Sequence, residues 1–93
     1  MALEFEWDPR KAEGNRKKHG VSFEEAKSAF WDALSLTIPD PEHSRGEERF
    51  VLLGLSLKAR LLYVAHQDKG DRVRIISARR ATLREKRDYE EKN

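Results

Sequence analysis

The chain has 93 residues, of which 38% are hydrophobic and 39% are charged, and its formal net charge is +2. This predicts one small domain over residues 1–93, with a modest core and a charged surface, in which clustered basic residues would suit an anionic partner. The absence of cysteine excludes disulfides, thiolate metal sites and a cysteine nucleophile. No apolar run is long enough to span a membrane and no signal-peptide pattern is present, so we expect a cytoplasmic protein.

The N-terminal part of the chain predicts a strand and then a basic helix. Residues 3–7 alternate apolar and acidic side chains, which indicates a short strand at a sheet edge. Asp8 can cap a helix that has Pro9 in its first turn, and Gly20 suits the position just after the last turn. We therefore expect a helix over residues 9–19. Its surface is so polar that it is either solvated or used for binding.

A second helix is predicted to begin after Ser22. Ser22 can cap the amide of Glu25 and Glu25 can reach back, as in a capping box. Apolar residues then recur on one helix face, which favours packing on a sheet over a base-stacking platform. The residues of this face are Phe23, Ala26 and Phe30.

The rest of the chain predicts four successive strands and a last helix. The strands lie at residues 34–38, 48–54 and 60–66 and from Arg72 onward, and short loops between strands favour an antiparallel meander. A second capping box at Thr82 starts a helix with few apolar residues. The order β-α-α-β-β-β-β-α predicts an α+β fold with helices packed on one face of a mainly antiparallel sheet.

The last strand carries an unusual number of arginines. Val73 and Ile75 point to one face of this strand and Arg74 to the other, because side chains alternate along a strand. An unpaired arginine is costly to bury. These arginines therefore either pair with carboxylates at the rim of the sheet or line an anion site.

The remaining residues suit RNA cleavage without a metal. The histidines lack metal-ligand spacing, and no nucleophile elbow or phosphate-binding glycine loop is present, so we expect no metal and no cofactor. RNA can be cut by attack of its own 2′-hydroxyl on the adjacent phosphate. That reaction needs charge stabilisation and two proton transfers, which arginine, histidine and carboxylate side chains can supply.

Three arginines are candidates for binding the phosphate. Arg49, Arg74 and Arg79 could converge on one phosphate group. Arg79 also precedes the last helix, whose N-terminus offers free backbone amides to an anion.

The proton-transferring candidates each have a structural alternative. His43 and Glu48 precede Arg49 in the chain, but Glu48 and Arg49 could equally form a cross-strand surface pair. His66 could be a hydrogen-bonded histidine at a strand end. His19 could interact with the C-terminus of its own helix, where a cation is favoured.

Residues along nearly the whole chain resemble the BrnT family, toxins of bacterial type II toxin–antitoxin modules. The most specific strings are Lys18-His19-Gly20-Val21 and Arg74-Ile75-Ile76-Ser77-Ala78-Arg79. Other matching positions are Phe5-Glu6-Trp7-Asp8, Asn15, Phe23, Ala26, Phe30, His43, Glu48-Arg49, Gly54, Ala81, Glu85 and Tyr89. The resemblance implies a RelE-like fold and a ribonuclease that arrests growth by cutting RNA. It also implies a ribbon-helix-helix antitoxin (BrnA-like), a heterotetramer of the two proteins, and DNA contact only through the antitoxin.

The resemblance also bears on the site. RelE-like sites rely on basic residues and a tyrosine, which favours Arg79 and Tyr89 as catalytic residues. The other catalytic candidates are His43 and Glu48, and the candidates for RNA or phosphate binding are Arg49, Arg74, His19 and Lys18. The alternative function is a non-catalytic module that binds RNA or protein. A small-molecule enzyme is a distant third, because little chain remains to build a deep pocket.

Overall fold

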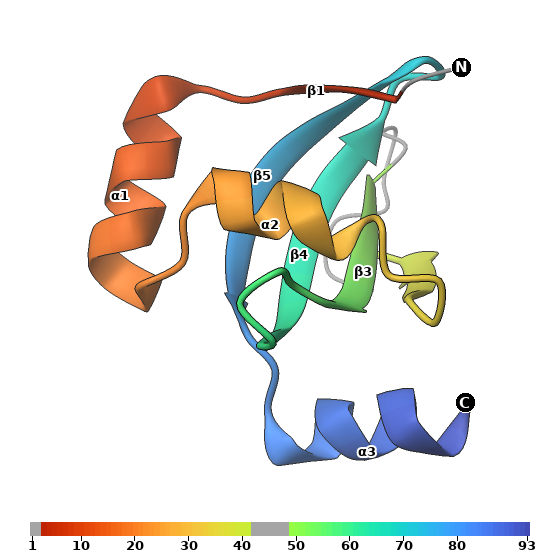
Figure 1. Ribbon diagram of the computed structural model, residues 1–93. Helices are drawn as coiled ribbons and strands as arrows, with labels where there is room; N and C mark the ends of the chain where they lie inside the picture. Colours follow the sequence, from red (N-terminus) through yellow and green to blue (C-terminus); the bar gives the residue numbers. More distant parts are fainter. Residues whose placement is uncertain (1–2, 42–48) are drawn as a thin grey trace.

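A five-stranded sheet with two helices on one face forms the body of the molecule (Figure 1). The structure is a computed structural model that describes residues 3–41 and 49–93. Its elements are β1 (Glu4–Glu6), α1 (Pro9–His19), α2 (Phe23–Ala29), β2 (Leu36–Pro39), β3 (Arg49–Leu55), β4 (Leu61–Asp68), β5 (Arg72–Arg80) and α3 (Leu83–Glu91). The α+β class and the element order predicted from the sequence are confirmed.

The sheet has the strand order β1-β5-β4-β3-β2. Strands β2 to β5 form the predicted antiparallel meander, and β1 lies at the edge, where it pairs in parallel with residues 72–74 of β5. The sheet is therefore mixed. The parallel pair joins β1 to a strand that lies 68 residues later in the chain. No helix in the described part of the chain is long and apolar enough to cross a membrane.

The core lies between the sheet and the helices α1 and α2. Phe23 and Ala26 of α2 are buried against inward-facing strand residues, so the apolar face of this helix is core, as predicted. The backbone of α2 approaches β3 so closely that a Cβ atom on Gly54 would lie 2.5 Å from the carbonyl oxygen of Ala29. Glycine is required there because any larger residue would push α2 off the sheet. The buried core residues are Val21, Phe23, Ala26, Leu62, Val64, Val73, Ile75 and Ala78.

A buried ion pair ties α2 to the turn between β3 and β4. Ser22 caps the amide of Glu25 as expected, at 3.0 Å. The carboxylate of Glu25 does not return to Ser22, so that half of the predicted capping box is wrong. It accepts hydrogen bonds from the guanidinium of Arg60 and, at 2.7 Å, from the hydroxyl of Ser56. A buried carboxylate is costly unless it is paired with a charged or polar group. Glu25 therefore bonds Arg60 and Ser56 instead of capping its own helix.

Asn15 fastens α1 to the edge of β5. Strand β1 pairs only with residues 72–74, so the edge of β5 beyond them lacks a strand partner. The Asn15 amide nitrogen donates to the carbonyl oxygens of Ala78 (2.8 Å) and Val21 (3.0 Å). Its carbonyl oxygen accepts from the Ala78 amide at 3.0 Å. One buried side chain thus replaces a missing strand.

A β-bulge in β5 changes which side chains face outward. His66 pairs with Ile75, but Ala65 pairs with Ser77, so Ile76 is an extra residue. Without this extra residue, the register would place Arg79 opposite Leu62, whose side chain is fully buried. With it, Arg79 lies opposite Tyr63 on the open face.

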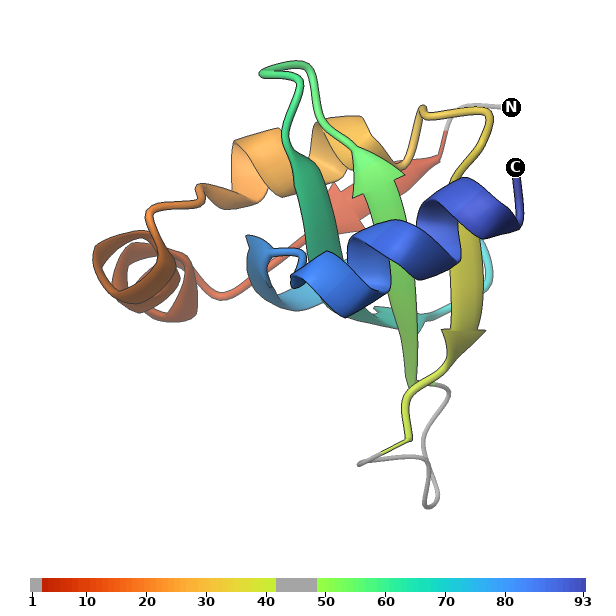
Figure 2. The same ribbon diagram turned by 90° about the horizontal axis from the view of Figure 1, so that it is seen from below.

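Helix α3 lies apart from α1 and α2, near the end of β5 (Figure 2). It touches the rest of the molecule mainly near its two ends. Glu85 in its first turn bonds Arg79, while Tyr89 donates to Asp32 and the side chain of Asn93 donates to the Leu34 carbonyl oxygen at 3.0 Å. This limited contact is consistent with the few apolar residues of the helix.

We predict that Asn15→Ala lowers the free energy of unfolding by about 3 kcal/mol, because the amide and carbonyl of Ala78 and the carbonyl of Val21 lose a buried partner. Urea unfolding of the parent and the variant measures this difference. The exposed neighbour Glu13 provides the control, since Glu13→Ala removes only a surface ion pair and should leave the unfolding curve close to that of the parent. Equal stability of the parent and Asn15→Ala would contradict the role given to Asn15.

The Glu25 cluster predicts a pH effect on stability. Hydrogen bonds from Arg60 above all, and from Ser56, lower the pKa of Glu25 from 4.5 despite its burial. A carboxyl with a lowered pKa in the folded state stabilises the protein above its unfolded pKa, and this stability is lost as the pH falls through the folded pKa. The stability difference between the parent and Glu25→Gln should therefore shrink in urea unfolding below about pH 4.5. The variant Glu24→Gln at the exposed neighbour controls for the loss of one acidic residue on the same helix.

Candidate functional site

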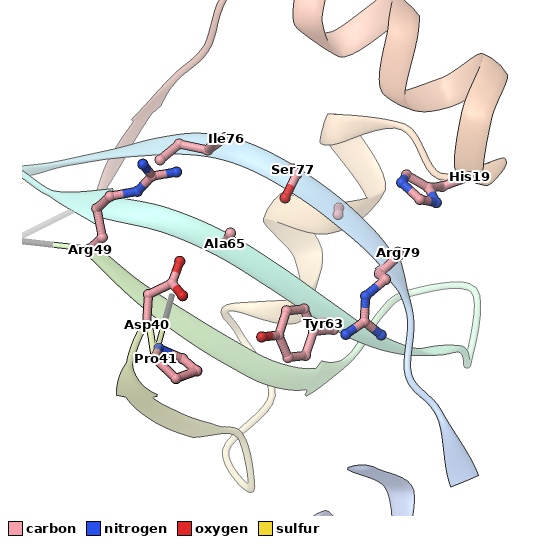
Figure 3. A pocket seen from close by; sticks show the side chains of 10 residues that line it. His19, Asp40, Pro41, Arg49, Tyr63, Ala65, Ile76, Ser77 and Arg79 are labelled. Carbon is pink, nitrogen blue, oxygen red and sulfur yellow. The ribbon is translucent and has the colours of Figure 1, made fainter. Parts of the chain in front are cut away.

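A groove crosses the face of the sheet that α1 and α2 leave open (Figure 3). Its volume is about 540 Å³, enough for a sugar-phosphate unit. It is lined by His19, Asp40, Pro41, Arg49, Tyr63, Ala65, Ile76, Ser77, Ala78 and Arg79. The lining includes three of the residues predicted to act on RNA, which are His19, Arg49 and Arg79.

Arg79 is held in place from two sides. Its guanidinium carbon lies 3.9 Å from the centre of the Tyr63 ring, a cation–π contact. Its two terminal nitrogens each donate to the Glu85 carboxylate at 2.9 Å. These hydrogen bonds raise the pKa of Arg79 further above its ordinary value, against the effect of burial. The result is a permanent cation with a fixed orientation at one end of the groove.

The same carboxylate organises the start of α3. Glu85 accepts from the Thr82 amide at 2.9 Å, and the Thr82 hydroxyl accepts from the Glu85 amide at 3.1 Å, so the second predicted capping box is confirmed. The hydrogen bonds from Arg79 and from Thr82 lower the pKa of Glu85, while burial opposes them. Glu85 therefore joins Arg79 to α3 as well as starting the helix.

His19 reaches the groove because Asn15 docks its helix. The two residues are four apart and so share a face of α1, which the Asn15 hydrogen bonds hold against β5 beside Ala78. His19 is half-buried and lies at the Arg79 end of the groove (Figure 3). A titratable imidazole and a fixed guanidinium thus share one end.

Arg49 lies at the opposite end of the groove (Figure 3). On β4, Arg49 lies opposite Gln67, whereas Arg79 lies opposite Tyr63. The two pairing positions on β4 are separated by roughly 13 Å of strand. Two cations spaced along a groove suit an extended phosphate backbone better than one phosphate, contrary to the single convergence point expected for the arginines.

Arg74 and Tyr89 lie outside the groove. Arg74 donates to Glu6 of β1 at 3.2 Å, in a cluster where its hydrogen bond and nearby cations lower the Glu6 pKa. Tyr89 donates to Asp32, and burial together with this hydrogen bond raises its pKa to about 12. Arg74 lies in the same cross-strand row as Arg49, with Gln67 between them, but its guanidinium is engaged by Glu6. Tyr89 is engaged by Asp32.

Two further predicted residues are also elsewhere. Lys18 is exposed on α1, next to His19 but not in the groove lining. His66 is 5% exposed and lies against the rings of Phe30 and Phe50, which supports its structural alternative. Its burial lowers its pKa, so the ring is neutral at pH 7. His43 and Glu48 lie outside the described residues.

Tyr63 is the groove residue that sequence reasoning missed. The Arg79 guanidinium stacks on its ring, and its hydroxyl points toward the side of the groove formed by Asp40 and Pro41 (Figure 3). The alternation of buried Leu62 and Val64 around it signals an outward-facing tyrosine. Its pairing with Arg79 depends on the bulge, which leaves no clear signal in the sequence.

The groove is lined by two arginines, an imidazole, a phenol and the buried carboxylate of Asp40. Among residues 3–41 and 49–93, no group of three or more histidine, aspartate or glutamate side chains is placed to hold a metal ion. The donors present can bind phosphate oxygens and move protons. Their arrangement therefore suits chemistry at a phosphodiester.

Comparisons with known proteins identify the family of the chain and structures of similar fold. Residues 7–85 match the family described as "Ribonuclease toxin, BrnT, of type II toxin-antitoxin system". The crystal structure of the Brucella abortus ribonuclease toxin BrnT is similar in fold, with a TM-score of 0.68 and 20% sequence identity, over 88% of this chain and all of that one. No curated protein sequence matches the chain.

Proposed function

The chain belongs to the BrnT family of ribonuclease toxins of type II toxin–antitoxin systems, and on this premise we propose that it is a metal-independent endoribonuclease. The observation that carries the proposal is the groove on the open sheet face, which Arg79, His19 and Tyr63 line together. Arginine supplies there the charge stabilisation that phosphodiester cleavage demands. The RNA supplies its own nucleophile.

The proposed reaction transfers two protons. His19 removes the proton of the 2′-hydroxyl, whose oxygen bonds to the phosphorus while the bond to the 5′-oxygen breaks. Histidine suits this step because its imidazole can accept a proton, and a tyrosine hydroxyl can donate one to the leaving oxygen. We assign the second role to Tyr63. The products are a 2′,3′-cyclic phosphate and a 5′-hydroxyl.

The arginines divide the work of binding. Arg79 contacts the scissile phosphate and stabilises the charge of the phosphorane, and Arg49 contacts another phosphate along the strand. Lys18, exposed beside His19, adds attraction for the backbone. Glu48 and His43, which precede Arg49 in the sequence, stay predicted catalytic residues.

The biological role follows from the family. We propose that RNA cleavage in the cytoplasm arrests growth and that a cognate ribbon-helix-helix antitoxin neutralises the toxin in a heterotetramer, with DNA contacted only through the antitoxin. The exposed basic surface of α1 supports a partner surface. Its basic residues are Arg10, Lys11, Arg16, Lys17 and Lys18.

We predict that Arg79→Ala slows RNA cleavage about 100- to 1,000-fold, because it removes the main charge stabilisation. End-labelled RNA in excess chelator, with and without ribosomes, measures the rate and the cyclic phosphate end. The control is Arg80→Ala, which removes a neighbouring exposed arginine outside the groove and should keep the parent rate. Circular dichroism checks that both variants are folded. RNA binding without cleavage by the parent would favour the non-catalytic alternative.

A second comparison separates the two tyrosines. Tyr63→Phe should slow cleavage about 100-fold, because a proton donor is lost while the ring under Arg79 remains. Tyr89→Phe should stay within about 2-fold of the parent rate, because Tyr89 lies outside the groove and bonds Asp32. Single-turnover rates give both values. The reverse order would restore Tyr89 as the catalytic tyrosine that the family resemblance implies.

A further inference from the structure

A second hollow adjoins the groove on the same face, between the sheet and α3. We name it the α3 slot, and its volume is about 640 Å³. Its floor, which the sheet forms, is largely apolar, and its wall, which α3 forms, is polar. The floor residues are Leu36, Ile38, Val51, Leu53 and Tyr63, and the residues on α3 and its cap are Thr82, Arg84, Glu85, Asp88 and Lys92.

The α3 slot is held open by the way α3 is attached. The Arg79–Glu85 pair fixes the start of the helix, and the Tyr89–Asp32 and Asn93–Leu34 hydrogen bonds fix its end. A helix that packed on this floor would place apolar residues at the facing positions. Here those positions are charged, and the nearby Leu83 is 78% exposed instead. The helix therefore spans the floor without filling the space above it.

The α3 slot is continuous with the proposed active site. Tyr63 and Pro41 line both the groove and the slot. Glu85 lines the slot and bonds Arg79, which lines the groove. A nucleotide whose phosphate lies at Arg79 would thus have the slot within reach of its own base or that of its neighbour.

We propose that the α3 slot binds a nucleobase of the RNA next to the scissile phosphate. A base has two apolar faces and polar edges, which match an apolar floor and a polar wall. The wall carries two cations, Arg84 and Lys92, and two carboxylates, Glu85 and Asp88, so it suits a neutral group rather than a second phosphate. The subsite rests on the proposed ribonuclease function and makes it base-selective.

The polar wall of the slot, on α3, is tested through base preference. A pool of oligoribonucleotides randomised at the two positions flanking the cut is digested by the full-length protein in excess chelator, and the cut sites are sequenced. Asp88→Asn should change the preference at one flanking position about 5-fold, because a carboxylate that only accepts becomes an amide that also donates. Glu90→Gln on the same helix lies outside the slot lining and should keep the parent profile.

The floor of the slot is tested with a matched truncation. Ile38→Ala should lower kcat/KM about 5-fold on an oligonucleotide of preferred sequence, whereas Leu57→Ala, an exposed residue outside the slot, should not. On the same oligonucleotide with an abasic residue at the preferred position, the parent and Ile38→Ala should be equal, which a merely structural effect would not produce.

The outcomes separate the two proposals. Cleavage that continues with an unchanged base profile in Asp88→Asn overturns the base subsite alone. The same result with weakened antitoxin binding would assign the slot to the protein partner instead. No cleavage by the parent on free or ribosome-bound RNA would overturn the proposed function and the subsite together.

Discussion

The hydrogen bonds of one buried asparagine determine where the functional groups of this fold meet. Strand β5 is paired by β1 over only three residues, and beyond them its edge would expose unpaired backbone groups. Asn15 satisfies that edge at Ala78 and holds α1 against it. The docked helix then brings His19 to the groove from a segment that contributes nothing else to it. The need to hydrogen-bond the backbone groups at the edge of β5 thus determines where His19 lies in the groove.

The electrostatics of the groove follow from a second constraint, the extra residue in β5. Because the bulge at Ile76 reverses the alternation, Arg79 faces outward and meets Tyr63 and Glu85 rather than the core. The carboxylate and the ring keep the guanidinium oriented, yet it lines the groove with its side chain 35% exposed. Desolvating a free arginine would be costly, whereas a partnered one at the rim is ready to bind an anion. The same pair anchors α3 and so keeps the neighbouring hollow open.

Much of the fold could be predicted from the sequence because local signals agree with one another. The caps at Asp8 and Thr82 and the apolar alternation of the strands indicate the elements and their order. The arrangement of the site was harder to predict from the sequence, because it depends on strand register and on ion pairs between residues far apart in the chain. Alternation alone puts Arg74 on the outer face of the sheet. Only the parallel pairing with β1 shows that Glu6 lies opposite Arg74 and accepts its hydrogen bond. Likewise, the choice between Tyr63 and Tyr89 follows from an irregular pairing and a contact with Asp32 that no spacing in the chain reveals.

The pairing of β1 with β5 also has a consequence for how the molecule folds. Glu6 and Arg74 are 68 residues apart in the chain, whereas the meander from β2 to β5 joins neighbours through short turns. Long-range contacts close slowly, because the loop between them must first be ordered. During synthesis, β1 and α1 are made before their partner β5 and have to wait for it. The groove, which combines His19 of α1 with Arg79 of β5, therefore cannot be completed before β5 has left the ribosome.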